Sequence, residues 1–203
     1  MNFIFSKELI DNDPTTKRGK RSSQYKILDA KNNLLGQFFH SSEEPLIYVG
    51  DKEISIDTVS KFLKKTKHFL VDNKDRKQIG EYEILGGHGI DHFWKDIPSS
   101  PTGTIKLNDT LFNFRRVAPD VRYSFLKQET WGYFKFRLYA IERKEFYEYC
   151  LKMDVPIYDK PNQTKWRPFL GTIESNSDNI LAILAGLYLM EIEFAFEDSK
   201  NNG

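Results

Sequence analysis

One short segment of the chain carries side chains that could do metal chemistry. His88, Asp91 and His92 could supply nitrogen and oxygen ligands to a metal such as Zn²⁺ if they lay on one face of a helix. Three glycines around His88 disfavour a helix there, and no nearby glutamate could act as the base of a zinc-protease helix. We therefore expect a loop with no metal and no other cofactor. These three residues remain the candidates if a metal is bound.

A second candidate site is a group of basic side chains that could bind anionic phospholipid headgroups: Lys61, Lys64, Lys65 and Lys67. Each basic residue near an anionic surface contributes about 1 kcal/mol to binding. The alternative is a solvated helix end, because acidic residues such as Asp57 lie close by in the sequence. Binding that weakens steeply with salt would favour the first interpretation.

The segment before these lysines has apolar residues at helical spacing. The pattern predicts a short helix capped by Ser55 or Asp57, with an apolar side made of Ile56, Val59, Phe62 and Leu63. The lysines would then lie near its C-terminal end, where positive charge suits the helix dipole.

Composition excludes several classes of protein. The 203 residues carry 30 basic and 29 acidic side chains, a net charge of +1, so no basic excess indicates nucleic-acid binding. A single cysteine, Cys150, excludes an intramolecular disulfide, fits a reducing compartment, and is expected to be a buried structural thiol. The first residues lack the basic and apolar regions of a secretion signal. We expect a cytoplasmic protein.

The C-terminal part of the chain contains an unbroken apolar run over residues 180–190. A helix that is apolar on every side must be enclosed on every side. A bilayer span needs about twenty such residues, so this run is too short and the enclosing material is expected to be protein. We place a central helix at 177–196, with no transmembrane span. Gly186 within it is expected to mark the close approach of a strand, and Tyr188, if buried, must find a hydrogen-bond partner.

Most of the remaining chain reads as short strands. Two similar pieces, 25–39 and 68–84, each read as a strand, a polar turn and a returning strand with an early glycine. Another hairpin is predicted at 104–114, and residues 133–140 alternate between apolar and basic side chains. Residues 11–24 lack periodicity and are expected to be a mobile loop. The pattern predicts one domain, 1–203, that is mainly β (α+β). Its fold class is a closed antiparallel barrel of about twelve strands around a central, buried C-terminal helix.

The order of these pieces resembles the tubby-like superfamily, in particular its LURP-one-related and phospholipid-scramblase-like branch. The resemblance rests on Leu28-Asp29 before Gly36, on Val71-Asp72 before Gly80, and on the ending from Gly171 to the apolar helix. It covers roughly residues 24–198 and implies a twelve-stranded barrel around a central C-terminal helix.

The resemblance leaves the function open, and our first hypothesis is a protein without enzymatic activity. We expect a non-enzymatic binding or scaffold module that binds anionic phospholipid headgroups or a protein partner. Such a protein would be cytoplasmic or peripheral to a membrane. One alternative is a metal-dependent enzyme that uses the His88, Asp91 and His92 loop, and a second is a scramblase-like, membrane-associated protein.

Overall fold

The computed structural model describes most of the chain. Its backbone is described for residues 1–10, 22–41, 44–59, 67–84, 103–124, 129–140, 142–156 and 169–201. Side chains are described for 1–8, 22–41, 44–59, 67–84, 103–115, 135–140, 142–151 and 171–192.

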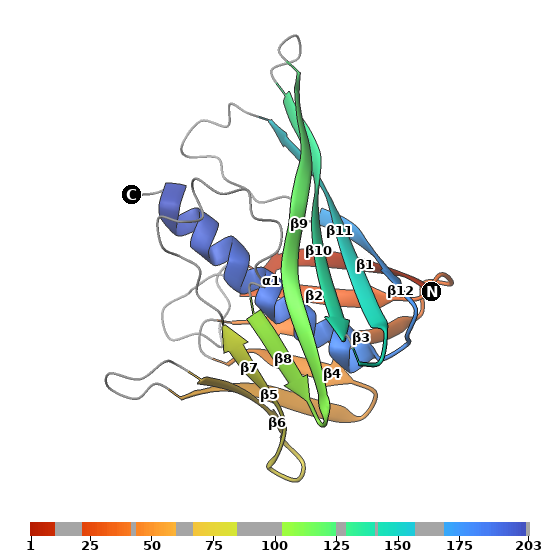
Figure 1. Ribbon diagram of the computed structural model, residues 1–203, viewed down its shortest axis with the longest axis vertical. Helices are drawn as coiled ribbons and strands as arrows, with labels where there is room; N and C mark the ends of the chain where they lie inside the picture. Colours follow the sequence, from red (N-terminus) through yellow and green to blue (C-terminus); the bar gives the residue numbers. More distant parts are fainter. Residues whose placement is uncertain are drawn as a thin grey trace.

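This described part contains twelve strands and a C-terminal helix (Figure 1). The strands are β1 (Asn2–Ile10), β2 (Ser22–Leu28), β3 (Leu34–His40), β4 (Leu46–Val49), β5 (Lys52–Val59), β6 (Lys67–Asp72), β7 (Lys77–Ile84), β8 (Gly103–Leu107), β9 (Thr110–Ser124), β10 (Glu129–Ala140), β11 (Glu145–Pro156) and β12 (Phe169–Ser175). The helix is α1 (Ile180–Asn201).

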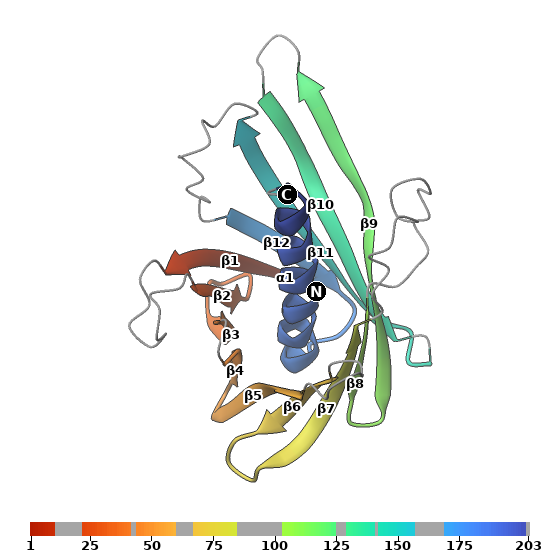
Figure 2. The same ribbon diagram turned by 90° about the vertical axis from the view of Figure 1, so that its left-hand side faces the viewer.

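The strands form a closed antiparallel barrel in which each strand pairs with its neighbours in sequence. The first and last strands close it, with Phe5 of β1 paired to Ile27 of β2 on one side and to Gly171 of β12 on the other. Figure 2 shows α1 between the wall formed by β1–β5 and the wall formed by β8–β12. The predicted fold class is therefore confirmed. None of the twelve described strands is therefore an edge strand.

Helix α1 is enclosed by the barrel wall. Every residue from Ala182 to Glu191 is buried, as an all-round apolar sequence requires. The helix begins at Ile180, later than the expected residue 177, and the Asn179 side chain accepts a hydrogen bond from the Ala182 amide at 3.2 Å. In the described residues, no helix has the length and apolar character that a membrane crossing needs.

The strand pattern follows the alternation in the sequence. On β10, Phe136 and Leu138 are fully buried, while Lys135 and Arg137 between them point outward. The predicted turn at Asn108-Asp109 joins β8 to β9, and Asn108 has the positive φ of 49° that asparagine tolerates.

The two similar hairpins predicted from the sequence are β2–β3 and β6–β7. Asp29 accepts hydrogen bonds from the Lys31 and Asn33 amides, both at 2.8 Å, so the carboxylate organises the turn. In each hairpin an aliphatic residue pairs with the glycine and the register shifts at the next residue. A Cβ on Gly36 would meet Leu184 of α1 at 2.7 Å, so this glycine lets the wall approach the helix.

Two expectations need correction. The helix predicted to be capped by Ser55 or Asp57 is wrong, because both residues lie in strand β5 between β4 and β6. Ile54 and Ile56 are buried at the spacing of a strand. Residues Ser22–Gln24, assigned to a mobile loop at 11–24, belong to β2 and pair with β1 and β3. The rest of that loop, residues 11–21, lies outside the described residues.

Candidate functional site

Most of the residues singled out from the sequence lie outside the described part of the chain: Lys61, Lys64, Lys65, His88, Asp91 and His92. Among the residues that are described, no group of three or more His, Cys, Asp or Glu side chains could hold a metal ion. Lys67 is described, at the start of β6. Its Nζ donates to Glu81 Oε1 at 2.8 Å, and this hydrogen bond raises the pKa of Lys67. Its charge is therefore matched by a neighbouring carboxylate.

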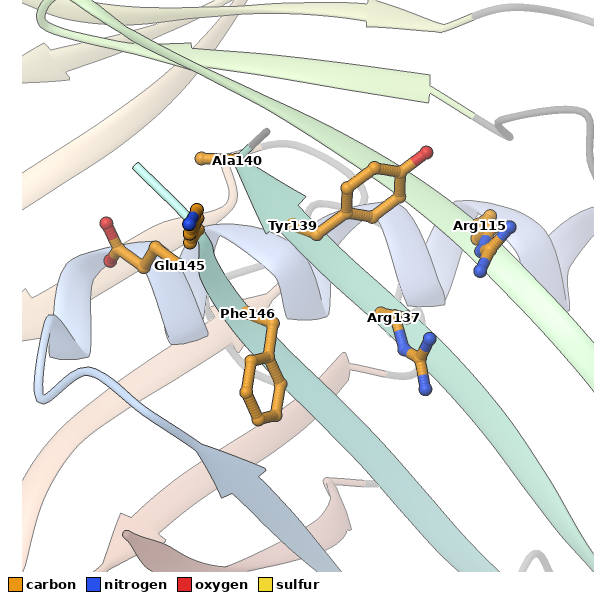
Figure 3. A pocket seen from close by; sticks show the side chains of 7 residues that line it. Arg115, Arg137, Tyr139, Ala140, Glu145 and Phe146 are labelled. Carbon is orange, nitrogen blue, oxygen red and sulfur yellow. The ribbon is translucent and has the colours of Figure 1, made fainter. Parts of the chain in front are cut away.

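A pocket of about 470 Å³ lies on the outside of the barrel, at the end of β10 and β11 nearest their turn. It is lined by Arg115, Arg137, Tyr139, Ala140, Lys144, Glu145 and Phe146. Figure 3 shows Arg115 on β9 beside Tyr139 on β10, with Glu145 at the far end. We call this site the arginine pocket.

The pocket borders a row of charged side chains on the outer face of β9–β12. The register pairs Arg115 with Arg137, Arg137 with Glu148, and Glu148 with Glu174. Each of these side chains lies next in sequence to a buried, inward-facing residue, so all four face outward. We call these four side chains the charge row. Across the four strands, two positive charges are followed by two negative charges.

Arg137 is already neutralised within the charge row. Its Nε donates to Glu148 Oε2 at 3.2 Å, and its Nη2 donates to the same oxygen. Lys135 lies 3.9 Å from the other oxygen of Glu148. Two charge-assisted hydrogen bonds to one carboxylate oxygen hold Arg137 in position beside the pocket.

Arg115 differs because its charge is not matched. Its Nε is buried and has no hydrogen-bond partner in the described structure. Its guanidinium carbon lies 5.4 Å from the centre of the Tyr139 ring, a cation–π contact that orients the group without neutralising it. Across the strands it faces another arginine, Arg137, and like charges in this position are destabilising.

The pocket can therefore bind an anion. Arg115 offers donors in the planar fork that matches carboxylate and phosphate. Lys144 adds a third positive charge at the β10–β11 turn, while Tyr139 and Phe146 supply apolar surface. Glu145 is the acidic residue of the pocket lining and lies at the opposite end from Arg115 (Figure 3). Its carboxylate accepts a hydrogen bond from the Tyr147 hydroxyl.

A separate polar cluster lies inside the barrel around the middle of α1. The Tyr188 hydroxyl and His68 Nδ1 are hydrogen-bonded at 2.9 Å, so Tyr188 has the partner that its burial requires. Glu191 accepts from both Lys7 and Tyr25. His40 lies beside Tyr188, with ring centres 6.2 Å apart. Burial lowers the pKa of both histidines. These contacts join the helix to the wall, and we assign them a structural role.

Sequence reasoning did not find the arginine pocket. Arg115 and Arg137 are far apart in the sequence, and the spacing within each strand shows only that a basic side chain faces outward. Cys150 was also misjudged: it faces outward on β11 and is half-buried, and this partial burial raises the pKa of its thiol.

Comparisons with known proteins add no relative. No protein-family model matches the chain, and neither the curated proteins nor the solved structures yield a match.

Proposed function

We propose that the protein is a non-enzymatic binding module of the tubby-like type, and that its arginine pocket recognises the headgroup of an anionic phospholipid. The observation that carries the proposal is the unmatched guanidinium of Arg115 at the edge of an outward-facing pocket. The tubby-like assignment is supported by the closed barrel of twelve strands around a buried C-terminal helix.

The composition of the pocket suits a headgroup. A phosphate or carboxylate can accept hydrogen bonds from Arg115 and approach Lys144, while Tyr139 and Phe146 contact its carbon atoms. The anion would also offset the repulsion between Arg115 and Arg137. Binding of this kind places the protein at the surface of an anionic membrane without insertion.

Sedimentation with lipid vesicles tests the proposal. The wild-type protein should bind vesicles of phosphatidylcholine with phosphatidylserine and should not bind vesicles of phosphatidylcholine alone. Arg115→Gln should weaken binding about fivefold, because one basic residue near an anionic surface contributes about 1 kcal/mol. Binding should fall as salt is raised, since the contacts are exposed to solvent.

Lys52→Gln is the matched control. Lys52 is an exposed cation on β5, on the far side of the barrel from β11 in the strand order. Its loss removes the same net charge as Arg115→Gln but leaves the pocket intact. If both variants lost binding equally, the interaction would depend on overall charge and the pocket would not be the site. If the wild type failed to bind at low salt, the proposal would be wrong.

A further inference from the structure

The outer face of β9–β12 has a charge order that is complementary to itself. The charge row reads Arg115, Arg137, Glu148 and Glu174 along four neighbouring strands. Consider a second copy related by a 180° rotation about an axis that lies between the two copies and runs parallel to the strands. This rotation reverses the order of the strands but leaves the position of each residue along its strand direction unchanged. In a second copy placed against this face, positive groups would therefore lie opposite negative groups along the whole row.

Within one copy, the two ends of the charge row are unmatched. Glu148 pairs with Arg137 and approaches Lys135, but Arg115 and Glu174 form no ion pair in the part of the chain that is described. Each end residue lies across from a residue of its own sign, an arrangement that costs stability in a lone sheet. An anion would relieve only the arginine end, whereas a second copy would relieve both ends.

The adjacent row nearer the β10–β11 turn is also self-complementary. Tyr139 of β10 pairs in register with Phe146 of β11, and both side chains are half-buried on the outside of the barrel. The same rotation places Tyr139 of one copy over Phe146 of the other. Aromatic contacts at the centre with charges beside them are the usual arrangement of a protein interface.

We propose that the outer face of β9–β12 binds the same face of a second copy of this chain, in a two-fold dimer. Arg115 then lies opposite Glu174 of the second copy, and Arg137 lies opposite Glu148 of the second copy. Each contact occurs twice because the interface is isologous. The two sheets pack face to face with their strands within about 30° of parallel.

The inference does not rest on anion binding, although both use Arg115 and Arg137. Dimer formation covers the arginine pocket, so the two states exclude each other. Self-association is measured without lipid, and vesicle binding is measured by the bound fraction. One proposal can therefore fail while the other stands.

Sedimentation velocity over a range of protein concentrations tests the dimer. At an ionic strength of about 0.01 M, where the Debye length is about 30 Å, the wild-type sedimentation coefficient should rise with concentration. Arg115→Glu and Glu174→Arg should each weaken association about tenfold, because each puts like charges opposite each other at both symmetric contacts.

A charge exchange separates this interface from general attraction. In an equimolar mixture of Arg115→Glu and Glu174→Arg, opposite charges face each other again, so the mixture should associate more strongly than either variant alone. The double variant Arg115→Glu/Glu174→Arg should also associate. A wild type that stays monomeric at every concentration, or a mixture that remains monomeric while the wild type dimerises, would overturn the proposal. Both substitutions lie on the surface and should leave the fold intact, and circular dichroism checks that each variant folds.

Discussion

Lys7 of β1 and Glu191 of α1 form a buried ion pair across the inside of the barrel, although they lie 184 residues apart in the sequence. The Tyr25 hydroxyl of β2 donates to the same carboxylate oxygen. Glu191 is the charged residue in the buried part of the helix. The pair therefore fixes one helix residue against the strands that close the barrel.

Removing one member of this pair should strongly destabilise the fold. Lys7→Met leaves the Glu191 carboxylate buried without its cation, and a broken buried pair costs about 3–5 kcal/mol. Urea denaturation measures the loss. Replacing both, in Lys7→Met/Glu191→Leu, should cost less than either single change because no unpaired charge remains. Additive losses in the double variant would show that the ion pair does not couple the two residues.

Gly186→Ala should destabilise the protein although alanine favours a helix. A Cβ at this position would meet the Tyr149 hydroxyl oxygen at 2.2 Å, and that hydroxyl donates to the Ile183 carbonyl at 2.8 Å. Overpacking and the loss of this buried hydrogen bond together outweigh a gain of at most about 1 kcal/mol in helix propensity. We expect a net loss of about 2 kcal/mol in urea denaturation.

Tyr149→Phe provides the control for that clash. In the wild-type background it removes a satisfied hydrogen bond and should destabilise the protein. In the Gly186→Ala background it also removes the oxygen nearest to the new methyl group, so its cost should be smaller or reversed. If Tyr149→Phe cost the same stability in both backgrounds, the Tyr149 hydroxyl would not be the source of the strain in Gly186→Ala.

The architecture could be predicted because its signals are local or are extreme in composition. The all-apolar run ending at Met190 required enclosure, and Asp29 with Gly36 indicated a hairpin whose turn and bend the structure confirms. Gly186 was expected to mark a close contact, and a tyrosine of β11 makes it. Each of these inferences needs only the chemistry of a few consecutive residues.

The wrong helix at Ser55 and the missed arginine pocket have different physical causes. Ile56 and Val59 fit a helical spacing, but Ile54 and Ile56 also fit a strand, and pairing with β4 and β6 decides between them. The pairing of Arg115 with Arg137 depends on the register of two long strands, which no local pattern specifies.

The two interior histidines should make the fold less stable in acid. Burial lowers the pKa of His40 and His68 below 6.5. For His40, Glu191 opposes this shift and Lys7 adds to it. The unfolded chain therefore takes up protons first as the pH falls, so stability is full above about pH 6.5 and is lost as the pH falls toward the folded pKa values.

Urea denaturation at a series of pH values measures this effect. His40→Gln and His68→Gln should each flatten the dependence of stability on pH below about 6.5 relative to the wild type. Hydrogen bonds from Asn33 hold the pKa of Asp29 below 3.8, so the loss of stability from this carboxyl begins at a more acidic pH than the loss from the histidines. Parallel profiles for the wild type and both variants would show that neither imidazole is coupled to folding.

Reversing either end of the charge row should stabilise the single barrel. Arg115→Glu places a carboxylate across from Arg137, and Glu174→Arg places a guanidinium across from Glu148, so each change converts a like-charge pair into an opposite-charge pair. Such pairs differ by about 0.2–1 kcal/mol, and the gain should shrink as salt is raised. Thermal unfolding in dilute solution, where the protein is monomeric, measures this gain.

Lys106→Glu provides the opposite case, because Lys106 pairs in register with Glu81 and its reversal should destabilise the barrel by a similar amount. A loss of stability in Arg115→Glu and Glu174→Arg would mean that the like-charge pairs are not a cost to the monomer, and the case for a second copy would lose its energetic basis.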